Sequence, residues 1–137
     1  MKEALVQLLD TLELEKIDDN IYRGQTPETH NKRAFGGQVF AQAMLAAQDI
    51  VSGEGHDALA ERVLSAPGNP SVPIGYEDGG IREGRSFTTR RVVTSQRGRA
   101  IFNTELSFQL VGSGFSHQAE MPTCVGQKGF NTTAFNG

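Results

Sequence analysis

Residues 35–51 constrain the fold more than any other stretch, because they read as a helix that is apolar around much of its surface. Alanine, glutamine, leucine and methionine dominate this segment, and all four are good helix formers. Glycines 36 and 37 stand at its start, where a missing side chain lets another group approach the backbone closely. The apolar stripe is broad enough to predict a largely buried helix, and it consists of Val39, Phe40, Ala43, Met44, Ala47, Ile50 and Val51.

Residues 72–110 show the alternation of β-strands, interrupted at glycines. Val72, Ile74 and Tyr76 alternate, and the glycine pair at 79–80 predicts a bulge. Turns are predicted at the Glu-Gly pair 83–84 and the Arg-Gly pair 97–98, with the β-branched run RSFTTRRVVTSQ between them. The last strand is the clearest, and one of its faces is formed by Ala100, Phe102, Thr104, Leu106, Phe108 and Leu110.

Strands joined by tight turns form an antiparallel meander, and one face of such a sheet needs a cover. The buried helix of residues 35–51 can supply it, and its small alanines allow a curved sheet to come close. The sequence therefore predicts an α+β architecture, in which a curved antiparallel sheet wraps around one central helix.

The flanking segments are expected to add smaller elements. Residues 2–12 place leucines at helical spacing on one face, which we expect to be buried against something larger. Residues 13–24 look like strand with an Asp-Asp-Asn turn, and residues 26–33 form a polar loop. Residues 58–66, ALAERVLSA, have helical composition, and the tail of residues 123–137 is expected to be loose.

Composition excludes several classes of protein. The net charge is −3 and the pI near 5.6, and the arginines of residues 82–99 fall on two strands whose side chains alternate between faces, so nucleic-acid binding is not expected. Cys124 stands alone, which excludes an internal disulfide or a cysteine-based metal cluster. No apolar run reaches the roughly 18 residues of a membrane span. We expect a soluble protein of a reducing compartment. Its apolar content of 37% is low for a self-contained domain, which indicates that a partner subunit completes part of the hydrophobic core.

Six blocks of sequence, taken in order, carry a family resemblance: EKIDDNIYRGQ, FGGQVFAQAMLAAQ, VPIGYE, EGRSFTTRRVV, GRAIFNTELSFQ and HQAEMP. Over residues 5–122 the chain resembles the N-terminal repeat of type II acyl-CoA thioesterases. The resemblance implies a single hotdog fold over residues 1–122 followed by a flexible tail. It also implies hydrolysis of acyl-CoA to free fatty acid and CoA without a metal, with no cofactor beyond the CoA of the substrate.

Two departures from the family bear on function. Members are about twice this length, and their catalytic aspartate, threonine and glutamine lie in a second hotdog repeat, so the resemblance assigns no catalytic residue here. Where the family has an aromatic, histidine-containing strand, this chain reads DALAERVLSAPGN. The resemblance implies that this segment is the central strand beside the hotdog helix, whereas its composition is helical.

Candidate substrate-binding residues lie at the start of the long helix. Phe35, Gly36, Gly37 and Gln38 can offer backbone N–H groups to a carbonyl or an oxyanion, or the glycines only let helix and sheet pack closely. Gln42 falls one turn after Gln38 on the same face, so both could orient a water or lie at a subunit interface. Asp49, the acid of this segment, is expected to be solvated at the helix end.

A second candidate group, Arg85, Ser86 and Phe87, opens a strand. Arginine binds phosphate in a bidentate manner, so these residues could contact the phosphates of CoA. Arginines on a strand edge also serve as solubilising charges.

The sequence therefore predicts a thioesterase-family domain that takes acyl-CoA and pairs with a second hotdog domain, or with its own copies, through an unpaired strand edge. The alternative is a non-catalytic dimerisation or acyl-CoA-binding module. An enoyl-CoA hydratase ranks last, because the required Asp and His spacing is absent. The expected location is cytoplasmic, with no membrane span.

Overall fold

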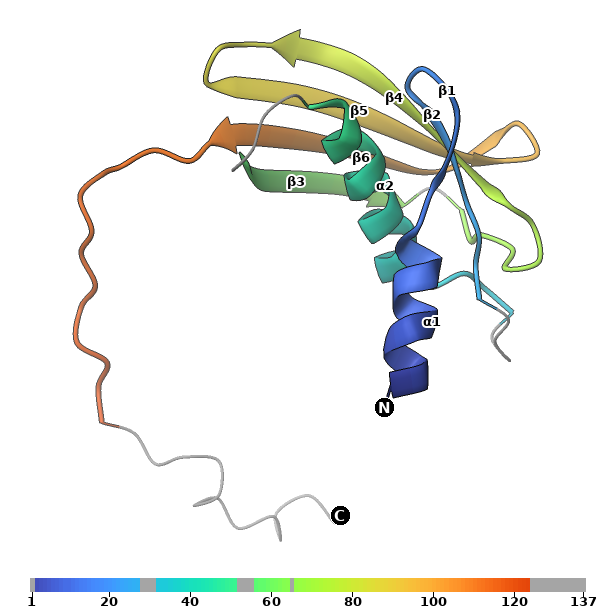
Figure 1. Cartoon of the computed structure of the whole chain (residues 1–137), viewed down its shortest axis with the longest axis horizontal. Helices are drawn as coiled ribbons and strands as arrows, with labels where there is room; N and C mark the ends of the chain where they lie inside the picture. The colour runs from blue at the N-terminus through green and yellow to red at the C-terminus, as the bar shows by residue number, and fades with distance from the viewer. Residues whose placement is uncertain (1, 28–31, 52–55, 65, 124–137) are drawn as a thin grey trace, which may run out of the picture.

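The computed structural model describes residues 2–27, 32–51, 56–64 and 66–123. Within these residues, two helices and six strands follow one another (Figure 1): α1 Lys2–Leu12, β1 Glu15–Asp18, β2 Ile21–Gly24, α2 Gly36–Ile50, β3 His56–Leu64, β4 Ile74–Glu83, β5 Phe87–Gln96 and β6 Arg99–Leu110. The strands form one antiparallel sheet in the order β1-β2-β4-β5-β6-β3. Helix α2 lies across one face of this sheet, as predicted.

The meander predicted from residue 74 onward is confirmed as β4, β5 and β6. Arg97 and Gly98 join β5 to β6 with φ of 49° and 75°, the left-handed pair that a two-residue hairpin turn requires. Pairing of β4 with β5 shifts between Gly80 and Arg82, which confirms a bulge after the glycine pair. The Asp-Asp-Asn turn is also confirmed, with Asn20 at φ 61° between β1 and β2.

The expectation of a helix over residues 58–66 is wrong. His56–Leu64 is a strand that pairs with β6 along its whole length, from the pair His56 and Leu110 to the pair Leu64 and Phe102. The free backbone edge of β6 offers a hydrogen-bond ladder, and this tertiary pairing outweighs the weak helical propensity of Ala, Glu and Arg. The strand lies at the edge of the sheet of this chain rather than in its centre.

The core lies between α2 and the sheet. Val39, Ala43, Ala46 and Ala47 of α2 are buried, and their small size lets the strands approach the helix. The alternation of β6 holds in its middle, where Phe102, Thr104, Leu106 and Phe108 are buried, whereas Ala100 and Leu110 at its ends are exposed. Phe40 packs edge-on against Phe102, with ring centroids 6.3 Å apart.

Gln42 joins four parts of the fold from the middle of α2. Its side chain is fully buried, and its Nε2 donates to the carbonyls of Thr11, at 2.6 Å, and Gln25, at 3.0 Å. Its Oε1 accepts a hydrogen bond of 2.6 Å from the hydroxyl of Tyr76 on β4. A Cβ on Gly24 would fall 2.9 Å from this amide, so the glycine makes room for it. Its side chain therefore braces the chain internally, which corrects the proposals that Gln42 orients a water or faces another subunit.

Helix α1 forms where predicted, but its leucines are not buried by this chain. Leu5, Leu8 and Leu9 each expose more than half of their surface, whereas Thr11 is buried. Gln42 ties only the last turn of α1 to the domain, and the rest of the helix projects beyond the sheet (Figure 1).

Residues 111–123 are exposed and belong to no helix or strand, and most of the predicted loose tail lies outside the described residues. No helix among the described residues has the length and apolar character needed to cross a bilayer.

Replacing Gln42 by leucine should lower the free energy of unfolding by about 2–4 kcal/mol, because the Tyr76 hydroxyl and two carbonyls would lose their partner inside the core. Urea unfolding followed by circular dichroism measures the change. Gln48→Leu is the matched control, because Gln48 is exposed on the same helix and its replacement should change stability by less than about 0.5 kcal/mol. Equal stability of the Gln42 variant and the wild type would contradict the bracing role.

Candidate functional site

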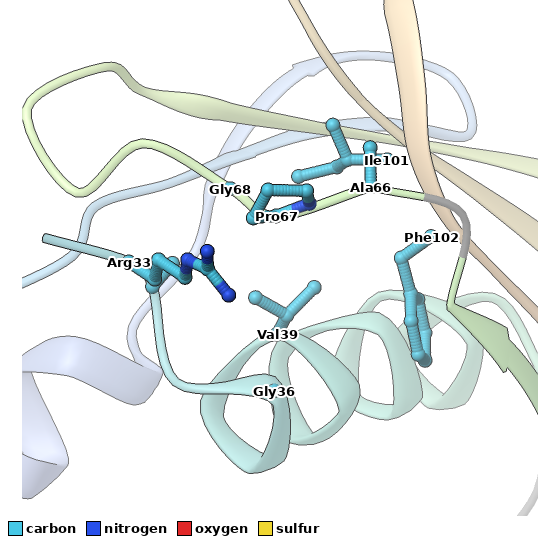
Figure 2. A pocket seen from close by; sticks show the side chains of 9 residues that line it. Arg33, Gly36, Val39, Ala66, Pro67, Gly68, Ile101 and Phe102 are labelled. Atoms are coloured by element: carbon cyan, nitrogen blue, oxygen red, sulfur yellow. The ribbon is translucent and has the colours of Figure 1, made fainter.

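An apolar pocket of about 290 Å³ opens beside the first turn of α2. Figure 2 shows the helix start below the pocket and the segment of residues 66–68 above it, with the Arg33 side chain reaching over the opening. Carbon surface dominates the lining, so the pocket suits an alkyl or thioether group rather than a strongly polar one. The lining residues are Arg33, Ala34, Gly36, Val39, Ala66, Pro67, Gly68, Ile101 and Phe102.

Backbone hydrogen bonds hold the walls of this pocket. The N–H of Ala34 donates to the carbonyl of Gly68 at 2.8 Å, and the N–H of Ala66 donates to the carbonyl of Ile101 at 3.0 Å. A Cβ on Gly68 would lie 3.2 Å from both Ala34 and Ile101, so glycine permits this close approach. Hydrogen bonds and close packing within the chain therefore form the walls of this pocket.

The buried amide of Gln96 fixes the loop that follows the pocket wall. Its Nε2 donates to the carbonyls of Asn69, at 2.8 Å, and Val72, at 2.7 Å, while its Oε1 accepts from the N–H of Asn69 at 2.8 Å. The loop that enters β4 is thereby tied to the end of β5.

The start of α2 offers donors and a favourable field for negative charge. Phe35 is the N-cap residue and makes no side-chain cap hydrogen bond. The N–H of Gln38 donates to the carbonyl of Phe35 at 3.0 Å, which corrects the expectation that it is available to a ligand. The N–H groups of Gly36 and Gly37 precede the first bond within the helix, and the helix dipole favours negative charge there. Gly36 lines the pocket, and a Cβ on it would meet nothing within 4 Å. The site can therefore polarise a carbonyl oxygen.

Acid–base groups are absent from the part of the lining that the structure describes. Among these described residues Arg33 is the ionisable one, and none is a carboxylate or a histidine. Glutamine cannot act as a base at neutral pH, and Gln38 and Gln42 are already engaged: the Nε2 of Gln38 donates to the carbonyl of Gln25 at 3.1 Å and to the Thr26 hydroxyl at 3.3 Å. The described lining residues therefore suit binding of an apolar group, and none of them supplies a base to activate a water.

The structure separates the two groups of candidate residues. Phe35 through Gln42 lie together at the start of α2, next to the Gln96 end of β5. Arg85, Ser86 and Phe87 are exposed at the opposite end of β5, about 30 Å away at the usual rise of a strand. Figure 1 shows this separation, with the β4–β5 turn at the far end of the sheet. One chain does not bring the two groups to a common ligand.

The structure contains a buried ion pair between β4 and β5 that was not predicted from the sequence. The Nε of Arg90 on β5 donates to Asp78 on β4 at 2.9 Å, and both side chains are almost completely buried. Arg90 also contacts the exposed Glu83 at 3.0 Å. Asp78 lies two residues after Tyr76 and four after Ile74, so strand alternation places its side chain on the same buried face. This spacing could have identified Asp78 as a buried acid from the sequence.

Asp49 is exposed at the end of α2, as expected, and it also makes a contact that the sequence did not predict. Its carboxylate accepts a hydrogen bond of 2.7 Å from the hydroxyl of Tyr22, which is buried on β2. Burial, and then this hydrogen bond, raise the pKa of Tyr22 to about 12. Asp49 therefore ties the end of α2 to the sheet while its side chain remains exposed to solvent. Among the described residues, no three His, Cys, Asp or Glu side chains gather as metal ligands would.

A curved antiparallel sheet, one long helix across it and an apolar pocket at the helix start together define a hotdog-fold protein. A family model described as the acyl-CoA thioesterase N-terminal domain matches residues 26–109. The match covers more than half of the chain, which therefore belongs to the acyl-CoA thioesterase family as its N-terminal hotdog domain.

Curated relatives agree with this assignment. The chain is 38% identical over 122 residues to acyl-CoA thioesterase 2 of Haemophilus influenzae, a match that covers 89% of this chain and 43% of that protein. It is also 38% identical to acyl-coenzyme A thioesterase 8 of Mus musculus, covering 86% of this chain and 38% of the relative. The chain thus spans less than half the length of these relatives.

Solved structures give the same result. A tesB protein of Mycobacterium avium subs paratuberculosis is similar with a TM-score of 0.79 and 29% identity, covering 90% of this chain and 49% of that one. A hot dog fold protein from Alicyclobacillus acidocaldarius, of unknown function, has a TM-score of 0.72 and 25% identity, with 89% and 47% covered. The predicted hotdog fold is confirmed.

The Asp78–Arg90 pair should make stability depend on pH in a defined direction. Burial raises the pKa of Asp78 above its ordinary value of 3.8, although Arg90 lowers it in part. A carboxyl with a raised pKa in the folded state binds more protons than in the unfolded state, so its contribution to stability falls as pH rises from 3.8 through the raised pKa.

Urea unfolding of the wild type and of Asp78→Asn over a series of pH values tests this direction. The stability of the wild type, measured relative to the variant, should decrease as pH rises above 3.8 and then level off. A relative stability that rises over this interval would show that the ion pair outweighs the burial.

Proposed function

We propose that this chain is the N-terminal hotdog half of an acyl-CoA thioesterase, which binds acyl-CoA at the start of α2 and needs a second hotdog domain for hydrolysis to free fatty acid and CoA. The observation that carries the proposal is the apolar pocket of about 290 Å³ beside Gly36. An acyl or pantetheine chain suits its lining, and the thioester carbonyl would meet the N–H groups of Gly36 and Gly37 at the helix start.

The need for a second domain is supported by the chemistry of the described lining residues. Thioester hydrolysis requires an activated water or a carboxylate nucleophile, and these lining residues provide neither. The relatives are more than twice as long as the segment they share with this chain, which leaves room in them for a second domain. The chain alone would then act as a binding module without turnover.

Strand β3 provides a route for pairing. It lies at the edge of the sheet and pairs with β6 on one side only. The backbone groups on its other side can form hydrogen bonds with an edge strand of a neighbouring sheet. Pairing there would turn β3 from an edge strand into a central one, as the family resemblance implies. The partner would be a second hotdog domain or another copy of this chain.

In such an assembly, Arg85, Ser86 and Phe87 could contact CoA phosphates held by the partner, since their distance from the pocket prevents them from sharing its ligand. We place the protein in the cytoplasm as part of the same proposal.

Gly36→Leu tests the site directly. A Cβ at this position would meet no other atom within 4 Å, so the backbone has room for a side chain, while the rest of the leucine would extend into the pocket mouth. Titration calorimetry with a non-hydrolysable medium-chain acyl-CoA should show affinity at least about tenfold weaker, equivalent to about 1.4 kcal/mol.

Gly112→Leu is the matched control, because its added side chain also enters open space, in the exposed segment after β6. It should bind as the wild type does. Equal binding by all three proteins would place the ligand elsewhere, and turnover of acyl-CoA by the purified chain at an ordinary enzymatic rate would refute the requirement for a second domain.

A further inference from the structure

A second hollow adjoins the pocket beside the start of α2. This hairpin hollow has a volume of about 330 Å³, and it shares Ala66, Pro67 and Ile101 with the pocket. Figure 2 shows these three residues together, across the pocket from the first turn of α2. Because the two hollows have this wall in common, one elongated ligand can extend from the pocket into the hairpin hollow.

The hairpin hollow is basic. Arg97 and Arg99, at the turn from β5 to β6, are the ionisable side chains among its described lining residues, and none of these residues is an acid. Both arginines are exposed, and neither forms an ion pair with a residue that the structure describes. Arg23, Arg90 and Arg91, by contrast, each contact a carboxylate. In a chain of net charge −3, two such arginines beside a hollow indicate a site for an anion.

The turn that carries the two arginines is fixed to the opposite wall of the hairpin hollow. Gln96 pairs with Arg99 across the hairpin. Its side chain forms hydrogen bonds of 2.7–2.8 Å with the backbone of Asn69 and Val72, which also line the hollow. The hydrogen bonds therefore hold the backbone of the arginines at a set position beside the hollow.

We propose that Arg97 and Arg99 bind the phosphate groups of acyl-CoA, while the pantetheine arm of the same molecule lies in the pocket beside Gly36. This role rests on the proposed function and deepens it, because it assigns a different part of the ligand to each hollow. A guanidinium group stays charged and can donate two hydrogen bonds to one phosphate, whereas the carbon-rich arm suits the apolar pocket. Arg85 lies at the opposite end of β5, so it cannot take this role in the same chain.

Arg97→Asn/Arg99→Gln tests the proposal by titration calorimetry with two non-hydrolysable ligands. One is a medium-chain acyl-CoA analogue, and the other is the matching acyl-pantetheine analogue, which has no phosphate. Asparagine tolerates the left-handed backbone of position 97, so the turn should be kept. The variant should bind the acyl-CoA analogue at least about tenfold more weakly than the wild type, and the acyl-pantetheine analogue within about twofold. Added salt should weaken acyl-CoA binding more in the wild type than in the variant.

Arg23→Gln/Arg91→Gln is the matched control, because it removes the same charge from two exposed arginines that line neither hollow. It should bind both ligands as the wild type does. Should the double variant at positions 97 and 99 fail to fold, Arg99→Gln alone leaves the turn residue unchanged. This single variant should bind the acyl-CoA analogue at least about threefold more weakly than the wild type.

Binding by the wild type distinguishes a failure of this inference from a failure of the proposed function. A wild type that binds neither ligand would refute both. A wild type that binds the acyl-CoA analogue no more tightly than the arginine variant or the control does would overturn the phosphate site alone. An equal loss of acyl-pantetheine binding in the arginine variant would also overturn it, because that ligand carries no phosphate.

Discussion

The burial of α2 against the sheet is the constraint on which the rest of the structure depends. Its strongest consequence falls on Gln42, whose polar side chain is buried together with the apolar ones. A carboxamide at the centre of a buried helical face must find partners or lose the free energy of its hydration. It finds them in Thr11, Gln25 and Tyr76, which belong to three different segments. The same bonds that satisfy the amide therefore also set where α1 ends and where β2 leaves the sheet.

The surfaces that remain uncovered share one property. The leucine face of α1, the outer edge of β3 and the open pocket at the helix start all lack something that a neighbouring domain or copy could supply. Such features are costly in a self-sufficient monomer, because apolar area and unpaired backbone stay in water. A hotdog domain that occupies less than half of its relatives is consistent with this pattern.

Polar groups divide between the two ends of α2. Its start places the N–H groups of Gly36 and Gly37 beside an apolar pocket, whereas its end is tied to the sheet through Asp49 and Tyr22, near the buried Asp78–Arg90 pair. Helix-start donors suit binding, and the Asp78–Arg90 pair links β4 to β5. This separation agrees with the proposal that hydrolysis requires a second domain.

The sequence by itself determined α2, the β4–β6 meander and the turn at Arg97-Gly98, because helical stripes, strand alternation and left-handed turn residues are local signals. Only the tertiary structure decided β3, the burial of Gln42 and the partners of Asp78 and Asp49. Residues 56–64 become a strand because β6 presents a free edge, and no local pattern records that edge. The same limit applies to the candidate substrate-binding residues. The sequence makes Gly36 and Arg85 candidates alike, and only the tertiary structure shows that they lie near opposite ends of β5.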